Sequence, residues 1–147
     1  MAIEPGYYPV YFEMINYLQP KWHGSSEEML KFVEESADST RHLYGDGMYS
    51  LLVNARVDNS NKLFIENGGE FSWPRTKAGF RDILVKYGKS SYILHRYGYL
   101  AMLAGDHKAF AEVLNETGTK WDESKDKYYK KKTWYEYHLN KSKAYLN

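Results

Sequence analysis

The chain has 147 residues, of which 43% are hydrophobic and 27% are charged, and its formal net charge is +1. These values are typical of one folded domain and exclude a disordered chain, and the short apolar runs exclude a membrane-spanning helix. The absence of cysteine excludes disulfides, thiolate metal sites and cysteine nucleophiles.

The first part of the chain is predicted to form two antiparallel helices. Apolar residues recur every three to four positions over residues 7–18, which indicates a helix that Pro20 prevents from continuing. After a short turn, Ser25 and Glu28 have the spacing of a capping box and open a second helix. Its inward-facing residues are predicted to be Met29, Leu30, Phe32, Val33 and Ala37. Because the turn is short, the two helices are expected to form a hairpin.

The next stretch contains a third helix and an ambiguous segment. The helix is predicted from Asp46 to about Val57, and residues 58–61 have the composition of a loop. In residues 62–73 an apolar run precedes Asn67-Gly68-Gly69, which would suit the turn of a short strand hairpin. The alternation of apolar and polar residues is poor, so we expect an irregular loop with a possible helical turn.

The second half of the chain is predicted to form four more helices. One begins at Pro74 and ends near Gly88, and the next is capped by Ser90 or Ser91. Gly105-Asp106 ends that helix and begins another, which Gly118 closes. A last helix is predicted from Asp122, with fraying beyond Asn140. The sequence therefore predicts an all-α chain of six or seven helices, each of about 10–14 residues.

Residues 92–117 carry the pattern of a tetratricopeptide hairpin, in which a small residue lies where two helices touch and Gly-Asp forms the turn. Gly98 lies seven positions before Gly105-Asp106, which matches this pattern. Phe110 departs from it, because the pattern has alanine at that position. The segment is therefore predicted to be a tetratricopeptide-like hairpin and not a consensus repeat.

Two longer stretches resemble a particular family. The first is Pro-Lys-Trp-x-Gly-Ser at residues 20–25, and the second combines Trp-Pro-Arg at 73–75, Gly-Phe at 79–80 and Ala-Gly-Asp at 104–106. Together they resemble an uncharacterised bacterial family of tetratricopeptide-like domains of unknown function, over about residues 9–121. His23 stands where the family pattern has glycine. The resemblance implies helical hairpins over residues 1–121, and residues 122–147 lie outside it as a basic aromatic helix that packs on or caps this domain.

No motif for catalysis, cofactor binding or metal binding is present. The five histidines do not have the spacing of a metal site, which needs at least three convergent ligands. Ser25 and Ser26 lie outside any hydrolase motif and are explained by helix capping. The glycines near residues 45–47 and 67–69 are turn glycines and not phosphate-binding loops. We therefore predict no catalytic, cofactor-binding or metal-binding residues.

Aromatic residues are the strongest pointer to a contact surface. The 15 tyrosines suit half-buried seams between helices, a partner-binding surface, or both. Trp22 lies in a loop, where it would either plug the end of the first hairpin or form a contact patch with His23. The residues proposed to bind a partner are Tyr11, Trp22, His23, Tyr99 and Trp134.

The tail combines lysines with aromatic rings. Residues 120–147 carry a net charge of +4, whereas residues 1–119 carry −3. Lysine interleaved with rings is the composition that binds single-stranded nucleic acid. A terminal helix that caps a helical array has the same composition, with rings facing inward and lysines facing solvent, and the scarcity of arginine favours this interpretation.

The favoured function is a protein–protein interaction module that binds another protein or a peptide, because stacked helical hairpins present a concave binding face. The alternatives are a small helical enzyme with an unrecognised site, and a weak nucleic-acid binder that acts through the Lys/Tyr tail. Neither nucleic acid nor a membrane is the expected partner. No secretion signal is visible at the start, so a soluble protein of the cytoplasm is the default expectation.

Overall fold

The computed structural model describes residues 8–18, 25–57 and 62–147. These residues contain nine α-helices and no β-strand, which confirms the predicted all-α class. The helices exceed the predicted number because one short helix was not expected and the tail forms two helices. The chain divides into two compact units, Met1–Lys86 and Tyr87–Asn147, whereas the sequence suggested a boundary after residue 121. Among the described helices, none is long and apolar enough to cross a membrane.

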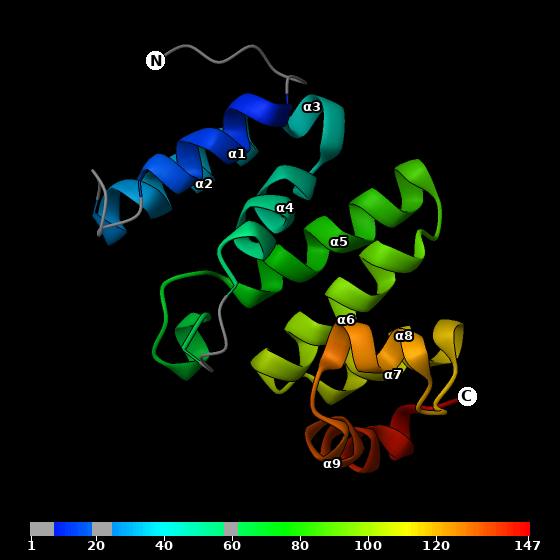
Figure 1. The fold of residues 1–147 in the computed structure, drawn as a ribbon. Helices are drawn as coiled ribbons and strands as arrows, with labels where there is room; N and C mark the ends of the chain where they lie inside the picture. Colours follow the sequence, from blue (N-terminus) through cyan, green and yellow to red (C-terminus); the bar gives the residue numbers. More distant parts are fainter. Residues whose placement is uncertain (1–7, 19–24, 58–61) are drawn as a thin grey trace. The chain divides into compact units, whose positions relative to one another are not determined.

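The described residues of the first unit form five helices and one 3₁₀ turn (Figure 1). They are α1 (Tyr8–Tyr17), α2 (Ser26–Ser39), α3 (Arg41–Tyr44), α4 (Gly47–Ala55), η1 (Ile65–Asn67) and α5 (Trp73–Tyr87), whose last residue lies past the unit boundary. The predicted helices at residues 7–18 and 46–57 are confirmed to within two residues. The predicted loop at 58–61, and most of the 20–25 motif, lie outside the described residues.

Helices α1, α2 and α4 pack against one another and enclose the core of the first unit. Ile15, Val33 and Leu52 are fully buried there, one from each helix. The cap at the start of α2 is confirmed, since the Ser25 hydroxyl accepts a hydrogen bond from the Glu28 backbone N–H at 3.1 Å. Local sequence signals thus set where α2 begins, and apolar burial sets which face it turns inward.

The short helix α3 was not predicted. Helix α2 ends at Ser39 and is followed by its C-cap Thr40, whose hydroxyl donates to the carbonyl of Ser36 at 2.8 Å. The chain then makes one more helical turn before Gly45. Gly45 has a φ of +58°, and the Asp82 carboxylate of α5 accepts a hydrogen bond from the backbone N–H of Asp46 at 2.9 Å. This corner depends on a contact with α5, which lies far away in sequence.

Helices α4 and α5 approach each other closely. The Ser50 hydroxyl donates to the carbonyl of Thr76, and both residues are fully buried. A side chain at Gly79 would collide with the Ser50 hydroxyl and with the carbonyl of Asp46, so this crossing requires glycine. The predicted start of α5 at Trp73-Pro74 is confirmed, with proline in the first turn.

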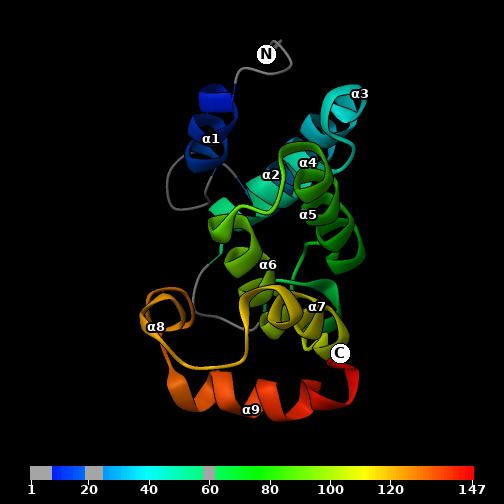
Figure 2. The ribbon, with the colours of Figure 1, turned by 90° about the vertical axis from the view of Figure 1, so that its right-hand side faces the viewer.

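The second unit is built on a hairpin of two antiparallel helices, with two more helices and a 3₁₀ turn packed on it (Figure 2). They are α6 (Ser91–Ala104), α7 (His107–Thr117), α8 (Glu123–Tyr129), α9 (Lys132–Ser142) and η2 (Lys143–Tyr145). Ser90, and not Ser91, caps α6 by accepting from the Ile93 N–H at 3.4 Å. Helix α8 packs on α6, and α9 packs on α7.

The predicted turn between α6 and α7 is confirmed in detail. Gly105 has a left-handed φ of +71° and donates to Met102 at 3.1 Å, while the Asp106 N–H donates to Ala101 at 2.9 Å. This is the Schellman arrangement, which satisfies the last carbonyls of α6. The Asp106 side chain then accepts from the Ala109 N–H at 3.0 Å and caps α7. Two residues therefore end one helix and begin the next.

Gly98 lies where neighbouring helices come close to α6, as its place in the hairpin predicts. A Cβ at this position would lie 3.1 Å from a Val113 methyl of α7 and would collide with the Tyr129 hydroxyl of α8. The absence of a side chain at Gly98 therefore lets both α7 and α8 pack closely against α6. Phe110, which departs from the repeat pattern, is fully buried and packs against Tyr129 and Tyr135 with ring centroids 5.9 and 5.8 Å away. The larger ring fills the space between the hairpin and the tail.

The prediction of a single tail helix is wrong, because the chain turns sharply at Lys130. Lys130 has φ +64° and ψ −45°, and the Lys131 N–H donates to the Tyr129 carbonyl at 2.7 Å, which is a γ-turn of the strained type. On one straight helix, Tyr129 and Tyr135 would lie about 120° apart around the axis. The turn between α8 and α9 instead lets both rings pack on Phe110. The predicted fraying after Asn140 is also wrong, since α9 continues to Ser142.

Candidate functional site

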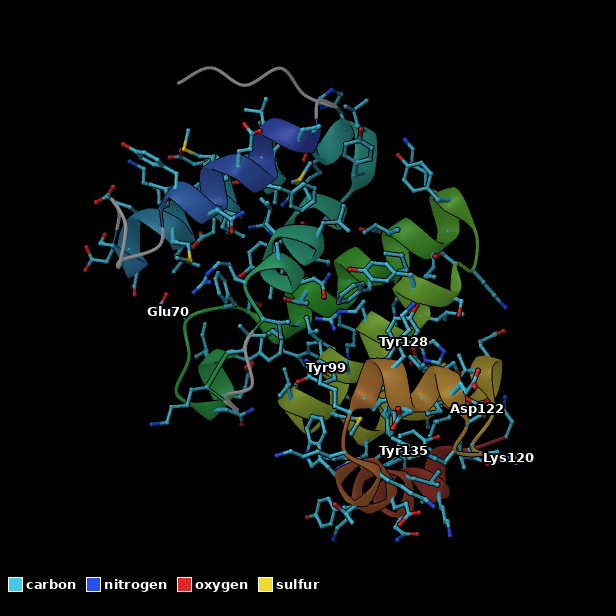
Figure 3. The ribbon with its side chains drawn as sticks, viewed as in Figure 1. Glu70, Tyr99, Lys120, Asp122, Tyr128 and Tyr135 are labelled. Atoms are coloured by element: carbon cyan, nitrogen blue, oxygen red, sulfur yellow. The ribbon has the colours of Figure 1, made fainter. Side chains whose placement is uncertain are left out.

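Two small pockets lie side by side on the first unit and share Glu70, and we call them the paired pockets. The first is lined by Ser26 and Met29 of α2, Arg56 after α4, and loop residues that include Leu63 and Gly68–Phe71. The second is lined by Leu30 and Glu34 of α2, Tyr49 of α4, Ile65 and Ser72 of the loop, and Arg75 of α5. Figure 3 places Glu70 in the loop that follows η1.

One face of α2 forms a wall common to both pockets. Residues 26, 29, 30 and 34 line them, and these positions follow one another at helical spacing on a single face. The eight steps from residue 26 to residue 34 correspond to about 12 Å along the helix axis. The two pockets therefore follow one another along α2, the first at its capped start and the second nearer its middle.

The opposite wall is an irregular loop that backbone hydrogen bonds fix in place. Ile65 donates to the carbonyl of Phe71 at 2.9 Å, and Phe71 donates to the carbonyl of Leu63 at 3.2 Å. Phe64 is fully buried and packs edge-on against Trp73, with ring centroids 5.1 Å apart. A Cβ at Gly69 would collide with the backbone of residues 62–63, so the loop closes on itself only with glycine there. This confirms the predicted irregular loop with a helical turn.

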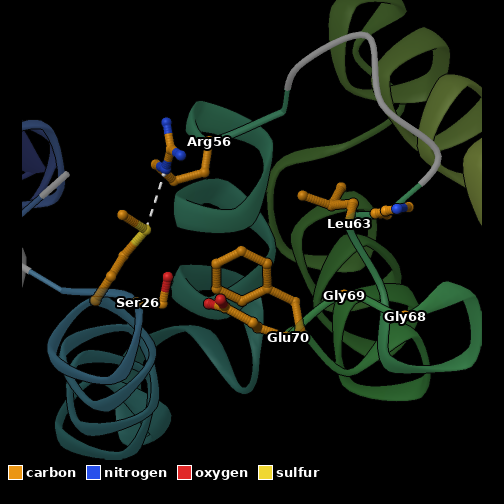
Figure 4. Close-up of a pocket in the computed structure, with 9 residues that line it drawn as sticks. Ser26, Arg56, Leu63, Gly68, Gly69 and Glu70 are labelled. Carbon is orange, nitrogen blue, oxygen red and sulfur yellow. Dashed lines mark hydrogen bonds between the residues drawn. The ribbon is translucent and has the colours of Figure 1, made fainter. Parts of the chain in front are cut away.

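The first pocket has a volume of about 190 Å³ and combines apolar and charged groups. Met29 and Leu63 supply apolar surface, and the Nε of Arg56 donates to the Met29 sulfur at 3.1 Å, as the dashed line in Figure 4 marks. A thioether sulfur is a weak, neutral acceptor, so this contact orients the guanidinium without neutralising it. Within the described residues, no carboxylate forms an ion pair with Arg56.

The second pocket has a volume of about 170 Å³ and is built around Tyr49. Its hydroxyl accepts from the Ser72 N–H at 2.8 Å, and burial raises the pKa of Tyr49, which keeps the hydroxyl protonated. Arg75 lies 4.8 Å from the centre of the Tyr49 ring and binds the carboxylates of Asp38 and Asp46 at 2.6 and 3.0 Å. Burial alone would lower the pKa of Arg75, but the two carboxylates have the larger combined effect and raise this pKa above its ordinary value.

The size and chemistry of the pockets limit what they can hold. Pockets for small-molecule ligands measure about 300–1,000 Å³, so each of these is smaller than a typical substrate or cofactor site. Within the described parts of the chain, no group of three histidine, aspartate or glutamate side chains converges on a point that would hold a metal ion. Each pocket has room for about one side chain of a bound partner, with an apolar floor and charges at its edge.

The residues predicted to bind a partner lie in different environments. Tyr11 is 1% exposed and Tyr99 is 5% exposed, so both belong to the core, and the expectation that they present surface to a partner needs correction. Tyr99, labelled in Figure 3, lies on α6. It packs edge-on against the partly exposed Trp134, with ring centroids 5.5 Å apart. Tyr11 belongs to the other unit. Trp22 and His23 lie outside the described residues.

Sequence reasoning missed Arg56 and Glu70. Asn67-Gly68-Gly69 indicates a turn, but nothing local in the sequence indicates that this turn lies opposite α2 and that Gly68 and Gly69 line a pocket. The one signal available in the sequence was the spacing of Ser26, Met29, Leu30 and Glu34, which mixes apolar and polar side chains on one helix face.

Two histidines of the second unit bind to each other. The Nε2 of His107 and the Nδ1 of His138 lie 3.2 Å apart and share a hydrogen bond between α7 and α9. Burial lowers the pKa of His138 to about 4, and burial also lowers the pKa of His107. Both rings are therefore neutral at pH 7, and the pair joins two helices.

Lys125 and His95 are also satisfied inside the second unit. The Lys125 ammonium is buried and donates to the carbonyls of Gly118 and Lys120 at 2.7 and 3.1 Å, and burial lowers its pKa. The His95 ring stacks on Tyr128 at 4.6 Å and lies 3.3 Å from the Tyr129 hydroxyl. The His95 contacts hold α8 on α6, and the Lys125 contacts bind α8 to the loop that precedes it. Because these groups are satisfied within the unit, the paired pockets are the stronger candidate site.

The paired pockets combine three kinds of wall, and known proteins offer no match for comparison. Their walls come from α2, from the ends of α4 and α5, and from the loop that contains η1. Comparisons of this chain with family models, with curated proteins and with solved structures return no match.

Proposed function

We propose that this protein is a protein-interaction module that holds a segment of another protein, or a peptide, along the paired pockets. The observation that carries the proposal is that two pockets of side-chain size lie next to each other between one face of α2 and the loop at residues 62–72. Peptide-binding sites of this kind take alternate side chains of an extended segment into neighbouring pockets.

The rigidity of both walls supports this function. Helix α2 is capped at Ser25, and the loop is fixed by the bonds between Leu63, Ile65 and Phe71. A site whose walls are ordered before binding loses less conformational entropy when a partner docks. The mixture of apolar floor and charged edge also matches the composition of interfaces between proteins that associate reversibly.

The hairpin of α6 and α7 is proposed to be tetratricopeptide-like. The support comes from the close approach at Gly98 and from the Gly105-Asp106 turn. Phe110 and the two tail helices would then be additions that adapt one such hairpin to a small unit. This part of the proposal concerns fold ancestry, and the binding function does not depend on it.

The experiment selects peptides from a phage-displayed random library against the full chain and measures their affinity by fluorescence anisotropy. Ser26→Trp and Glu34→Trp place a large ring at the edge of the first and second pocket respectively. The matched controls are Glu27→Trp and Glu35→Trp, which change exposed neighbours on α2 that line neither pocket.

We expect the two pocket variants to weaken binding by about tenfold or more and the two controls to change it by less than about threefold. Circular dichroism and urea unfolding of each variant report whether the fold is retained. The proposal fails if no peptide is enriched, or if the enriched peptides bind all four variants as well as they bind the original chain.

A further inference from the structure

We infer that the bound segment carries an acidic group at the first pocket and a basic side chain at the second. This inference rests on the proposed function and adds the chemistry of the partner. It comes from the unequal distribution of charge between the two pockets, which share one carboxylate, that of Glu70, but otherwise present opposite charges.

The first pocket has an arginine at its edge that pairs with no carboxylate of the described residues. This arginine is Arg56, which lines the pocket together with Lys62 and Glu70. The Nε–H of Arg56 donates to the Met29 sulfur at 3.1 Å. The other N–H groups of this guanidinium form no ion pair within the described residues. A guanidinium held at one nitrogen presents its remaining donors in a fixed plane, which suits a carboxylate. Figure 4 shows Arg56 and Glu70 among the lining side chains.

The second pocket is negatively charged once its internal ion pairs are counted. Arg75 is the one cation that lines it among the described residues, and the carboxylates of Asp38 and Asp46 already bind that cation. Glu34 and Glu70 remain, both exposed and neither in an ion pair within the part of the chain that the structure describes. Two carboxylates at the edge of a small pocket attract a lysine or arginine side chain.

The wall of α2 gives these charges an order and a spacing. The α2 residues that line the first pocket are 26 and 29, and those that line the second are 30 and 34. Their mean positions differ by about 4.5 residues, or about 7 Å along the helix. This distance matches the separation of residues i and i+2 in an extended chain, about 6.8 Å, which point to the same side. The recognised pattern is therefore acid-x-base or base-x-acid, according to the direction in which the segment lies.

The test uses four pools of synthetic fluorescent heptapeptides with two fixed central positions separated by one residue. One pool carries Asp-x-Lys, one Lys-x-Asp, one Asp-x-Asp and one Lys-x-Lys, and the other positions are random uncharged residues. Binding to the full chain is measured by anisotropy, and is repeated with Arg56→Glu and Glu34→Lys. Glu35→Lys is the matched control, since Glu35 is exposed on the same helix but lines neither pocket.

We expect one of the two mixed-charge pools to bind about tenfold more tightly than either like-charge pool. Arg56→Glu should shift the preference to Lys-x-Lys, and Glu34→Lys should shift it to Asp-x-Asp, whereas Glu35→Lys should leave it unchanged. A change of preference cannot result from unfolding, which would only weaken every pool.

The outcomes separate this inference from the proposed function. If all four pools bind equally and Ser26→Trp still abolishes binding, the charge pattern is wrong and the binding function stands. If the preference does not respond to Arg56→Glu or to Glu34→Lys, the assignment of charges to pockets is overturned. If no pool binds, both the inference and the proposed function fail.

Discussion

At the scale of single residues, two positions show how much depends on backbone conformation. Gly69 closes the loop that walls the paired pockets, where a side chain would meet the backbone of residues 62–63. Lys130 turns the tail with a φ of +64°, which non-glycine residues rarely adopt. Position 69 therefore requires glycine, whereas Lys130 has a side chain at a positive φ that glycine would adopt without steric cost.

Gly69→Ala is predicted to destabilise the protein by about 2 kcal/mol, the size typical of a forced backbone shift. Gly68→Ala is the control, because Gly68 has a φ of +86° but open space around it, and should cost about 1 kcal/mol. Urea unfolding of both variants measures the difference. Equal stability of Gly69→Ala and the original chain would contradict the close contact between the loop and residues 62–63.

Lys130→Gly is predicted to stabilise the protein by about 0.5–1 kcal/mol, because glycine adopts a positive φ without steric cost. Lys131→Gly serves as the control, since Lys131 has a φ of −113° and gains nothing from glycine. Thermal unfolding followed by circular dichroism compares the two variants. A loss of stability in Lys130→Gly as large as in Lys131→Gly would argue against the γ-turn.

At the scale of helices and loops, local sequence signals are sufficient to predict where several helices begin and end. The caps at Ser25 and Asp106 and the turn at Gly105 could be predicted because their hydrogen bonds join residues within five positions of each other. The break at Lys130 could not, since its cause is the burial of Tyr129 and Tyr135 against Phe110, far away in sequence. The paired pockets were missed for the same reason, because they exist only where α2 meets the loop.

The contact between α7 and α9 is predicted to weaken in mild acid. His138 has a pKa of about 4 in the folded chain because of its burial, against about 6.5 in an unfolded chain. Between these values the unfolded chain binds a proton that the folded chain excludes, so stability is full above pH 6.5 and falls as the pH drops toward 4. The loss due to His138 is about 2 kcal/mol, reduced from the full shift because the site is partly solvated.

The measurement is urea unfolding at pH 7 and at pH 4.5. Burial also lowers the pKa of His95 and of His107, so these histidines add to the loss of stability in acid. The contribution of His138 is isolated by His138→Gln, which should lose less stability in acid than the original chain. His42→Gln is the control, because His42 is exposed on α3. An acid response of His138→Gln identical to that of the original chain would refute the role of this histidine pair.

At the scale of the whole molecule, the distribution of aromatic rings bears on which function is proposed. Tyr129 and Tyr135 of the tail are buried, so they are not available to stack on the bases of a nucleic acid. Exposed charge and side-chain-sized pockets instead come together on the first unit, at α2 and the loop. The proposed binding function therefore rests on that unit, and the contacts of the second unit explain its stability.

The most direct test of the binding site is a nuclear magnetic resonance titration of the ¹⁵N-labelled full chain with a selected peptide. The account predicts that the largest backbone amide shifts fall on residues 26–34 and 62–72, with smaller ones at Arg56 and Arg75, and that α9 stays unchanged. Shifts that concentrate on α8 and α9, or that spread evenly over both units, would contradict the assignment of binding to the paired pockets.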